Sequence, residues 1–245
     1  MSRMPTWLLT AVPLVATLVL AAAAAGAATF VDPTGDSGTA PDITSARITN
    51  DARGRITFRL TLPNRTTALQ PTDVVFVFMD TDRNRSTGAA EGDDHALEVT
   101  PERITVLRWD GTQYAPVTAA ASTASFSAGV LTFVVRRGNL GNTSAFDALL
   151  FGGDVDGRTV RAVDVAPDTG RWTYTLTRFC VVPRVVGKTL AAARATLTRA
   201  GCRVGRVTRR ASTARAGRVV RQTPRAGTPL ARGARVNLVL SRRRG

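Results

Sequence analysis

The densest group of side chains that could do chemistry lies between residues 80 and 94. Asp80, Asp82 and Asn84 alternate at the end of an apolar run, and three more acids follow within the next ten residues. Alternating oxygen ligands of this kind open many calcium-binding loops, because every second side chain can turn toward one ion. The pattern predicts a structural Ca²⁺ site with six candidate ligands: Asp80, Asp82, Asn84, Glu91, Asp93 and Asp94.

A second interpretation of this stretch is a solvated turn. Arg85 stands where a helix-loop-helix calcium site needs glycine, and the flanking segments predict no helices, so that class of site is excluded. Arg83 and Arg85 also weaken the negative field of the acids. In the turn interpretation, the Asp and Asn side chains simply accept hydrogen bonds from backbone N–H groups.

His95 is the only histidine, and it follows Asp93 and Asp94 directly. A general base could be sought here, but no Ser or Cys nucleophile motif accompanies it, and there is no second histidine to share a metal. We therefore expect His95 at the rim of the fold, hydrogen-bonded to a neighbouring carboxylate. The carboxylate pairs fall in turns and show no recognisable catalytic spacing, which favours a non-catalytic role.

Aromatic side chains could form a face on which sugar rings stack. Aromatic residues make up only 6% of the chain, and the core needs most of them. A glycan platform and a purely structural role are therefore both open for the four candidates: Trp109, Tyr114, Trp172 and Tyr174.

Short alternating runs must position these groups. Residues 55–62 alternate polar and apolar side chains, which predicts a strand with one face in solvent. Residues 74–79 are continuously apolar, which predicts a central strand buried on both faces. No sustained helical period occurs between residues 29 and 176. The pattern predicts one antiparallel β-sandwich with strands at residues 43–49, 55–62, 73–79, 96–100, 104–109, 130–136, 148–152 and 172–176.

The last part of the chain predicts a smaller unit. Thr189 can cap a helix whose apolar residues recur on one face, and Gly201 suits its left-handed end. Three strand-like runs follow, at residues 203–208, 218–222 and 234–240. We expect one helix packed on a three-stranded sheet, so the whole chain is mainly β with a small α+β module.

The distribution of charge also changes between these two predicted units. The chain has 245 residues and a net charge of +15. Residues 177–245 hold 17 Arg, one Lys and no acid, whereas residues 29–176 hold all 18 acids and 14 Arg. Such a basic module attracts nucleic acid, anionic lipid or an anionic wall polymer. Five arginines close together in the sequence are the candidate anion-binding residues: Arg209, Arg210, Arg215, Arg218 and Arg221.

The first 28 residues have the composition of a secretory signal peptide. Arg3 gives a positive start, residues 7–20 an apolar core, and residues 21–28 a stretch of small residues. This predicts cleavage after Ala27 or Ala28 and no transmembrane segment in the mature protein. The alternative is an uncleaved anchor, since residues 7–25 are barely long enough to span a membrane. Secretion argues against an intracellular nucleic-acid partner.

Glycine and proline punctuate residues 181–241 in a characteristic order. Together these positions resemble the PASTA domain, a module found outside the membrane in penicillin-binding proteins and bacterial Ser/Thr kinases. The resemblance implies binding to peptidoglycan or β-lactams, without kinase or transpeptidase activity, because neither domain is attached. It is carried by Val182-Pro183, Val186-Gly187-Lys188-Thr189-Leu190, Ala200-Gly201, Val204-Gly205, Ala216-Gly217, Gln222-Thr223-Pro224, Gly227-Thr228 and Val236–Ser241.

The polar positions of the predicted sandwich also have a family pattern. They include Gly35-Asp36, Asp42-Ile43, Asp80-Thr81-Asp82 and Trp109-Asp110-Gly111. These positions resemble secreted domains related to family 9 carbohydrate-binding modules and the DOMON group. The resemblance implies a site for a sugar, haem or another small ligand.

Cys180 and Cys202 are the only cysteines, and they bracket the first strand and the helix of the PASTA-like module. In an oxidising compartment, their pairing closes a loop of about 22 residues and stabilises a small domain by about 3 kcal/mol. Two free thiols and an intermolecular bridge are the alternatives. Zinc is not supported by two cysteines and one histidine. We expect the intramolecular disulfide.

These features predict a secreted, non-enzymatic protein associated with the cell envelope. The expected divisions are a signal peptide at residues 1–28, a β-sandwich at 29–176, a linker at 177–180 and a PASTA-like domain at 181–245. The basic domain is expected to contact peptidoglycan or another anionic wall polymer, and the sandwich a second ligand such as a carbohydrate. The alternatives are an enzyme acting on a glycan or peptide through Asp93 and Asp94, and a purely structural spacer.

Overall fold

Alternation of apolar and polar residues builds the first sheet of the protein. A computed structural model describes residues 26–117 and 124–242. In strand β3 (Arg55–Thr61), Ile56, Phe58 and Leu60 are fully buried, while the residues between them face outward. The sheet has the order β1-β2-β3-β9-β8. Its other strands are β1 (Ala27–Val31), β2 (Ser45–Asn50), β8 (Ala124–Ser127) and β9 (Val130–Arg136).

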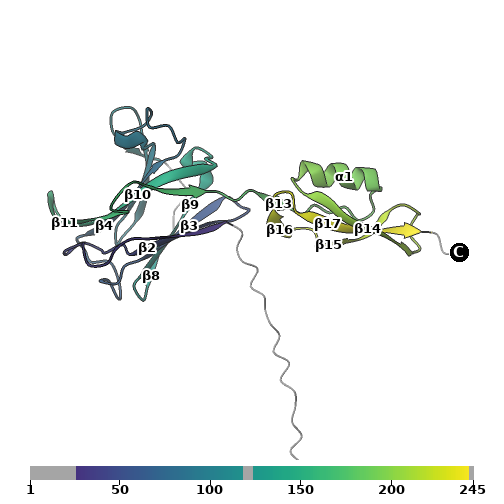
Figure 1. Ribbon diagram of the computed structural model, residues 1–245, viewed down its shortest axis with the longest axis horizontal. Coiled ribbons are helices and arrows are strands. Elements are labelled where there is room, and N and C mark those ends of the chain that lie inside the picture. The colour runs from purple at the N-terminus through teal and green to yellow at the C-terminus, as the bar shows by residue number, and fades with distance from the viewer. Residues whose placement is uncertain (1–25, 118–123, 243–245) are drawn as a thin grey trace, which may run out of the picture.

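A second, seven-stranded sheet packs on the first (Figure 1). All of its pairings are antiparallel, and β10 is its longest strand. The order is β11-β10-β4-β5-β6-β7, and β12 also pairs with β10. The bounds are β4 (Asp73–Asp80), β5 (His95–Val99), β6 (Ile104–Trp109), β7 (Tyr114–Pro116), β10 (Ala145–Asp156), β11 (Thr159–Ala166) and β12 (Trp172–Thr175).

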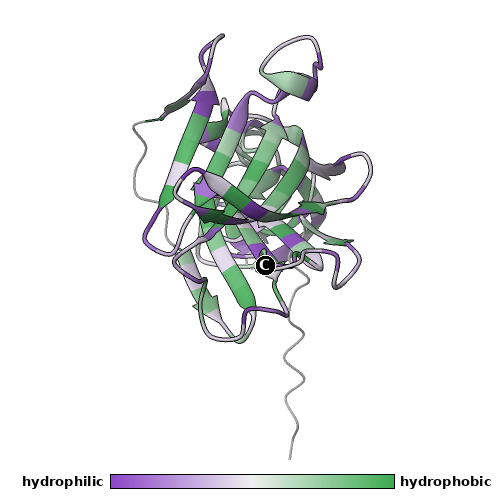
Figure 2. Ribbon diagram, turned by 90° about the vertical axis from the view of Figure 1, so that its left-hand side faces the viewer, coloured by the Kyte–Doolittle hydropathy of each residue, from purple (hydrophilic) through white to green (hydrophobic). Residues whose placement is uncertain are grey.

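The core lies between the two sheets, and apolar residues recur along the strands that enclose it (Figure 2). Phe58 stacks on Phe133 at 5.1 Å between ring centroids, and Phe146 packs beside Tyr174. Short 3₁₀ turns, η1 (Ala90–Gly92) and η2 (Arg137–Leu140), interrupt the loops. The predicted antiparallel sandwich is therefore confirmed.

The burial of strand β4 differs from the prediction. Its continuous apolar run predicted burial on both faces, but only Val75, Val77 and Met79 point into the core. Phe76 and Phe78 lie on the outer face of the sheet and are half-buried. Nothing among the described residues of the chain forms a third layer over them, so their apolar surface stays partly exposed.

The C-terminal body combines one helix with a three-stranded sheet, as predicted. Helix α1 (Leu190–Arg199) begins where the Thr189 hydroxyl accepts a hydrogen bond from Ala192 N at 3.3 Å, and it ends before Gly201, which has a φ of +76°. Ala193 and Leu197 bury against the sheet. The sheet order is β14 (Arg203–Ala211), β17 (Arg235–Arg242) and β15 (Val219–Thr223), and β14 runs parallel to β17.

A two-stranded ladder of this body follows directly after the junction with the sandwich. It pairs β13 (Phe179–Val181) with β16 (Pro229–Ala231). Thr177 is fixed from the sandwich side, because Asn50 accepts a hydrogen bond from Thr177 N at 3.0 Å and donates one to Thr177 O at 2.9 Å. Arg232 N donates to Arg178 O at 2.8 Å from the other side. The predicted linker is thus hydrogen-bonded to both bodies.

Candidate functional site

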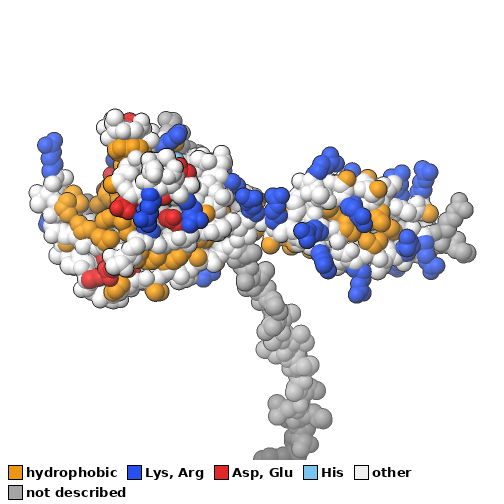
Figure 3. Space-filling model, turned by 45° about the horizontal axis from the view of Figure 1, so that its top comes forward, with side chains coloured by type: hydrophobic (Ala, Val, Ile, Leu, Met, Phe, Trp, Pro, Cys, Tyr) orange, Lys and Arg blue, Asp and Glu red, His pale blue; other side chains and the backbone are white. Residues whose placement is uncertain are grey.

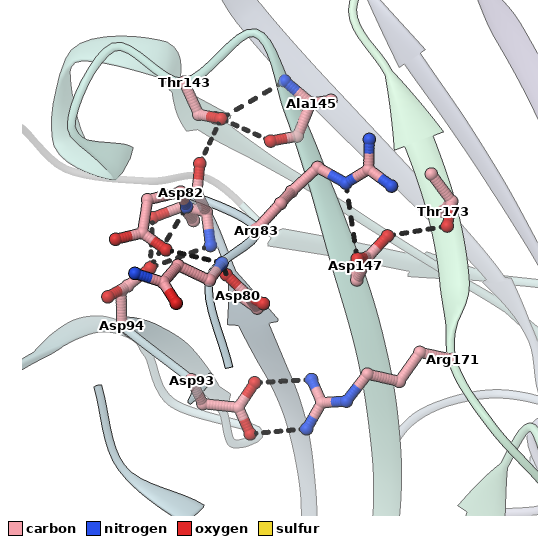
Figure 4. A network of polar contacts seen from close by, with 12 residues as sticks. Asp80, Asp82, Arg83, Asp93, Asp94, Thr143, Ala145, Asp147, Arg171 and Thr173 are labelled. Atoms are coloured by element: carbon pink, nitrogen blue, oxygen red, sulfur yellow. Dashed lines mark hydrogen bonds and ion pairs between the residues drawn. The ribbon is translucent and has the colours of Figure 1, made fainter. Parts of the chain in front are cut away.

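The loop at residues 80–94, which we call the Asp80 loop, brings together three of the six predicted calcium ligands. Single carboxylate oxygens of Asp80, Asp82 and Asp94 lie within 4.8 Å of one another (Figure 4). Backbone N–H groups of the loop donate hydrogen bonds to these carboxylates. Asn84 N donates to Asp80 Oδ1 and to Asp82 Oδ1, at 3.1 and 2.9 Å, and Thr81 N donates to Asp94 Oδ2 at 2.9 Å. Burial raises the pKa of Asp80.

The remaining three predicted ligands are engaged elsewhere. Asp93 points away from this group and forms a bidentate ion pair with Arg171, at 2.6 and 2.8 Å (Figure 4). Glu91 is exposed and lies 3.9 Å from Arg85. The side-chain oxygen of Asn84 accepts a hydrogen bond from Ser86 N at 3.1 Å. Calcium binding at the Asp80 loop stays a prediction, and its closest ligand set is Asp80, Asp82 and Asp94.

His95 is buried, with 5% of its surface exposed, rather than placed at the rim. Its Nδ1 lies 3.0 Å from the hydroxyl of Thr81, which donates its proton to Asp94 Oδ2 at 3.1 Å. Because Thr81 has a single hydroxyl proton, Nδ1 of His95 must carry the hydrogen of their bond. His95 is therefore linked to the Asp94 carboxylate through the Thr81 hydroxyl, and not by a direct hydrogen bond. Burial lowers the pKa of His95.

Two of the four candidate platform aromatics belong to the core. Trp172 is 8% exposed and stacks on Phe30, and Tyr174 is 2% exposed and donates a hydrogen bond to Asn50 Oδ1 at 2.8 Å. They cannot stack on a ligand. Trp109 and Tyr114 instead face each other across the pairing of β6 with β7, with ring centroids 5.3 Å apart.

Phenylalanines that the sequence did not single out extend this pair across the outer face of the seven-stranded sheet. Phe78 contacts Phe76, Tyr114 and Phe151, with centroids 5.4–5.7 Å apart. Every second residue of β4 and β10 contributes to this face. We call Phe76, Phe78, Trp109, Tyr114 and Phe151 the outer aromatic face; part of the apolar surface of the sandwich is visible in Figure 3.

The arginines of the C-terminal sheet gather mainly on the face opposite helix α1. Residues Val236, Leu238 and Leu240 of β17 point to the helix and are buried, so their partners in register share that side. Arg209 pairs with Leu240 and lies on the helix side. The opposite side carries four exposed arginines, which we call the outer-face arginines: Arg203, Arg210, Arg221 and Arg235.

The five predicted anion-binding arginines are therefore divided between surfaces. Arg210 and Arg221 belong to the outer-face arginines. Arg215 lies in the turn before β15, and the guanidinium of Arg218 donates to Gly187 O at 3.2 Å. Arg203 and Arg235, which are not among the five predicted residues, are direct partners in register between β14 and β17.

Cys180 and Cys202 form an intramolecular disulfide, as predicted, with their Cα atoms 5.4 Å apart. Both are buried in the small core of the C-terminal body, next to Leu197 and Val236. The bond fixes the start of the body to the short turn between α1 and β14. Within the part of the chain that the structure describes, no helix has the length and apolarity to cross a membrane.

Comparison with known proteins supports a family resemblance for the C-terminal body only. Neither the curated proteins nor the solved structures include a match to this chain. The resemblance of the sandwich to family 9 carbohydrate-binding modules and the DOMON group therefore stays a prediction. Residues 181–242 match the family model of the PASTA domain; the match covers α1, the three-stranded sheet and β16, and it begins at Val181, the last residue of β13. The C-terminal body of this chain is a PASTA domain, a module with a cell-wall-related binding role.

Proposed function

We propose that this protein is secreted and binds the cell envelope without catalysis. The PASTA domain contacts peptidoglycan or another anionic wall polymer through its outer-face arginines, and the sandwich offers a second surface to a glycan. The PASTA domain and its disulfide are consistent with an extracellular or envelope location.

The arrangement of charge on the PASTA domain carries this proposal. Residues 177–245 hold no acid, and Figure 3 shows basic side chains spread over this body. Arg203 and Arg235 lie directly opposite each other on neighbouring strands, where like charges destabilise a sheet. An anionic ligand relieves this repulsion. Guanidinium groups bind carboxylates and phosphates in pairs, which suits stem-peptide carboxylates and phosphate-bearing wall polymers.

The outer aromatic face supports the second surface. Its rings are half-buried, and they lie on a rigid sheet instead of a loop. Aromatic rings offer flat apolar area at low entropic cost, and a few polar groups at the edge set orientation. Glu98 and Thr105 alternate with the apolar residues on this side of β5 and β6. A glycan strand with apolar ring faces and polar edges fits this chemistry.

The contacts of the acidic residues agree better with a binding protein than with an enzyme that acts through Asp93 and Asp94. Asp93 is neutralised by Arg171, and Asp94 accepts hydrogen bonds from Thr81 and Asp82. Carboxylates held in this way position a loop and have little freedom to transfer protons. A purely structural spacer would not need the unbalanced charge of the PASTA domain.

Co-sedimentation of the purified protein with cell-wall sacculi tests the proposal. We expect binding at low ionic strength that persists when heparin competes and weakens as salt rises, because exposed charges are screened within about 10 Å at 0.1 M salt. Binding that heparin removes completely would show attraction to any polyanion. No sedimentation even at low salt would contradict the proposal.

A further inference from the structure

A second group of acids lies beside β10, nearer the C-terminal end of this strand than the Asp80 loop. Asp80 is opposite Asp147 on this strand, whereas Asp164 of β11 is opposite Gly152, roughly 17 Å away at the rise of a strand. The loop between β1 and β2 approaches Asp164. The group has five carboxylates from two segments of the chain: Asp32, Asp36, Asp42, Asp164 and Asp168.

Oxygens of these carboxylates converge on Asp36. Asp36, Asp42 and Asp164 each bring one oxygen within 4.8 Å of the others, and Asp36 also belongs to a second group with Asp32 and Asp168. Asp42 and Asp164 are each only 3% exposed. In this they differ from surface acids, which need no ion because water solvates them.

Two carboxylate oxygens of this group are buried without a partner. Asp42 Oδ2 accepts a hydrogen bond from Gly35 N at 3.0 Å, but its Oδ1 is buried and accepts none from any described residue. Asp32 Oδ2 is in the same state, while its Oδ1 accepts from Asp168 N at 3.2 Å. A buried carboxylate oxygen without a donor is costly, because it has lost its water.

The surrounding residues do not neutralise the group. Among the ion pairs between described residues, none includes any of the five carboxylates, and the nearby Arg65 is committed to Asp73 at 2.6 Å. The site therefore has an excess of negative charge that a cation would balance.

The loop that carries the acids is held in place by other contacts. A Cβ at Gly152 would clash with Pro41 O, so this glycine allows the loop backbone to pack directly on β10. Asn64 donates to Ala40 O at 2.7 Å and accepts from Asp42 N at 3.0 Å. The carboxylates are thus brought together by the fold, which reduces the entropy that a ligand must offset.

We propose that Asp36, Asp42 and Asp164 bind a Ca²⁺ ion, with Asp32 and Asp168 beside it. Ca²⁺ takes six to eight oxygen ligands at about 2.3–2.6 Å, so two of its ligands lie at most about 5 Å apart, which agrees with the spacing here. Mg²⁺ requires shorter distances and near-octahedral order. Backbone N–H groups of Gly35, Ile43 and Asp168 each donate to one carboxylate of this group. Unlike the Asp80 loop, however, the group keeps two buried oxygens without a donor, Asp42 Oδ1 and Asp32 Oδ2.

Thermal unfolding with matched variants tests this site independently of wall binding. The melting temperature of the purified protein is measured in chelator, in 1 mM calcium and in 1 mM magnesium, at constant ionic strength. The variants are Asp36→Asn, which removes one exposed charge from the site, and Asp82→Asn, which makes the same change in the Asp80 loop. Calorimetric titration with calcium gives the affinity of each protein.

We expect calcium to raise the melting temperature of the native protein and of Asp82→Asn by about 5 °C or more, and magnesium to raise it less. Asp36→Asn should lose this shift, bind calcium at least about tenfold more weakly, and melt in chelator at or above the native temperature. Three results would overturn the proposal: no calcium shift in the native protein, an equal shift with magnesium, or a shift lost in Asp82→Asn and kept in Asp36→Asn.

Discussion

Arg171 and Asp93 show how a residue that is chemically suggestive in the sequence can have a structural role. Both side chains are more than nine-tenths buried, and they form two hydrogen bonds with each other. The sequence placed Asp93 with Asp94 because the two are adjacent. Adjacent residues in extended backbone point in opposite directions, and so Asp94 joins the Asp80 loop while Asp93 does not.

Arg171→Leu should therefore destabilise the protein strongly. It leaves the Asp93 charge buried without a partner, which costs about 3–5 kcal/mol in the free energy of unfolding. The matched control is Arg83→Leu, which breaks the pair with Asp147; Arg83 is half exposed, so we expect a loss of only about 0–1 kcal/mol. Urea denaturation of the two variants measures the difference. Equal losses would show that the Arg171 pair is not buried in solution.

At the scale of the elements, regular alternation was enough to predict most of the sandwich. The run at residues 55–62 gave β3 to within a residue, because one face is fully buried and the other is wet. Strand β11 was missed because it is largely exposed; Val160 and Val163 are 58% and 46% accessible. The site at Asp36 could not be predicted, since Asp164 is more than 120 residues away from Asp36 and Asp42 and meets them only where the loop between β1 and β2 packs on the paired strands β10 and β11.

Strand β1 also places the start of the folded protein earlier than the sequence suggested. Ala27 and Ala28 pair with Thr49 and Ile48, and the carbonyl of Gly26 accepts a hydrogen bond from the Tyr174 hydroxyl at 2.6 Å. Cleavage after Ala27 or Ala28 would remove these contacts, whereas the residues of the predicted leader before Gly26 lie outside the described part of the chain.

We therefore predict that the leader is cut after Ala25, so that the secreted protein begins at Gly26. N-terminal sequencing of protein recovered from culture medium measures this directly. The residue before the cut would be alanine in either case, so recognition by the peptidase does not distinguish the sites. A mature chain that begins at Ala28 or Thr29 would contradict the prediction.

At the scale of the whole molecule, the two bodies have opposite charge and separate surfaces. All 18 acids lie before residue 169, and the PASTA domain carries none. The junction between them is short (Figure 1), and hydrogen bonds between Asn50 and Thr177 hold it on the sandwich side. A polymer attracted to the PASTA domain is therefore kept close to the sandwich, which raises the effective concentration of any second ligand on the same polymer.

We expect the outer-face arginines, and not the total charge, to bind wall polymer. The direct measurement is the affinity for purified sacculi of two double variants with equal charge loss. One is Arg203→Gln with Arg235→Gln on the outer face, and the other is Arg194→Gln with Arg199→Gln on the exposed side of α1. We predict at least about tenfold weaker binding for the outer-face pair and less than about threefold for the helix pair, since bidentate contacts require a fixed surface. Equal losses in the two variants would contradict the claim.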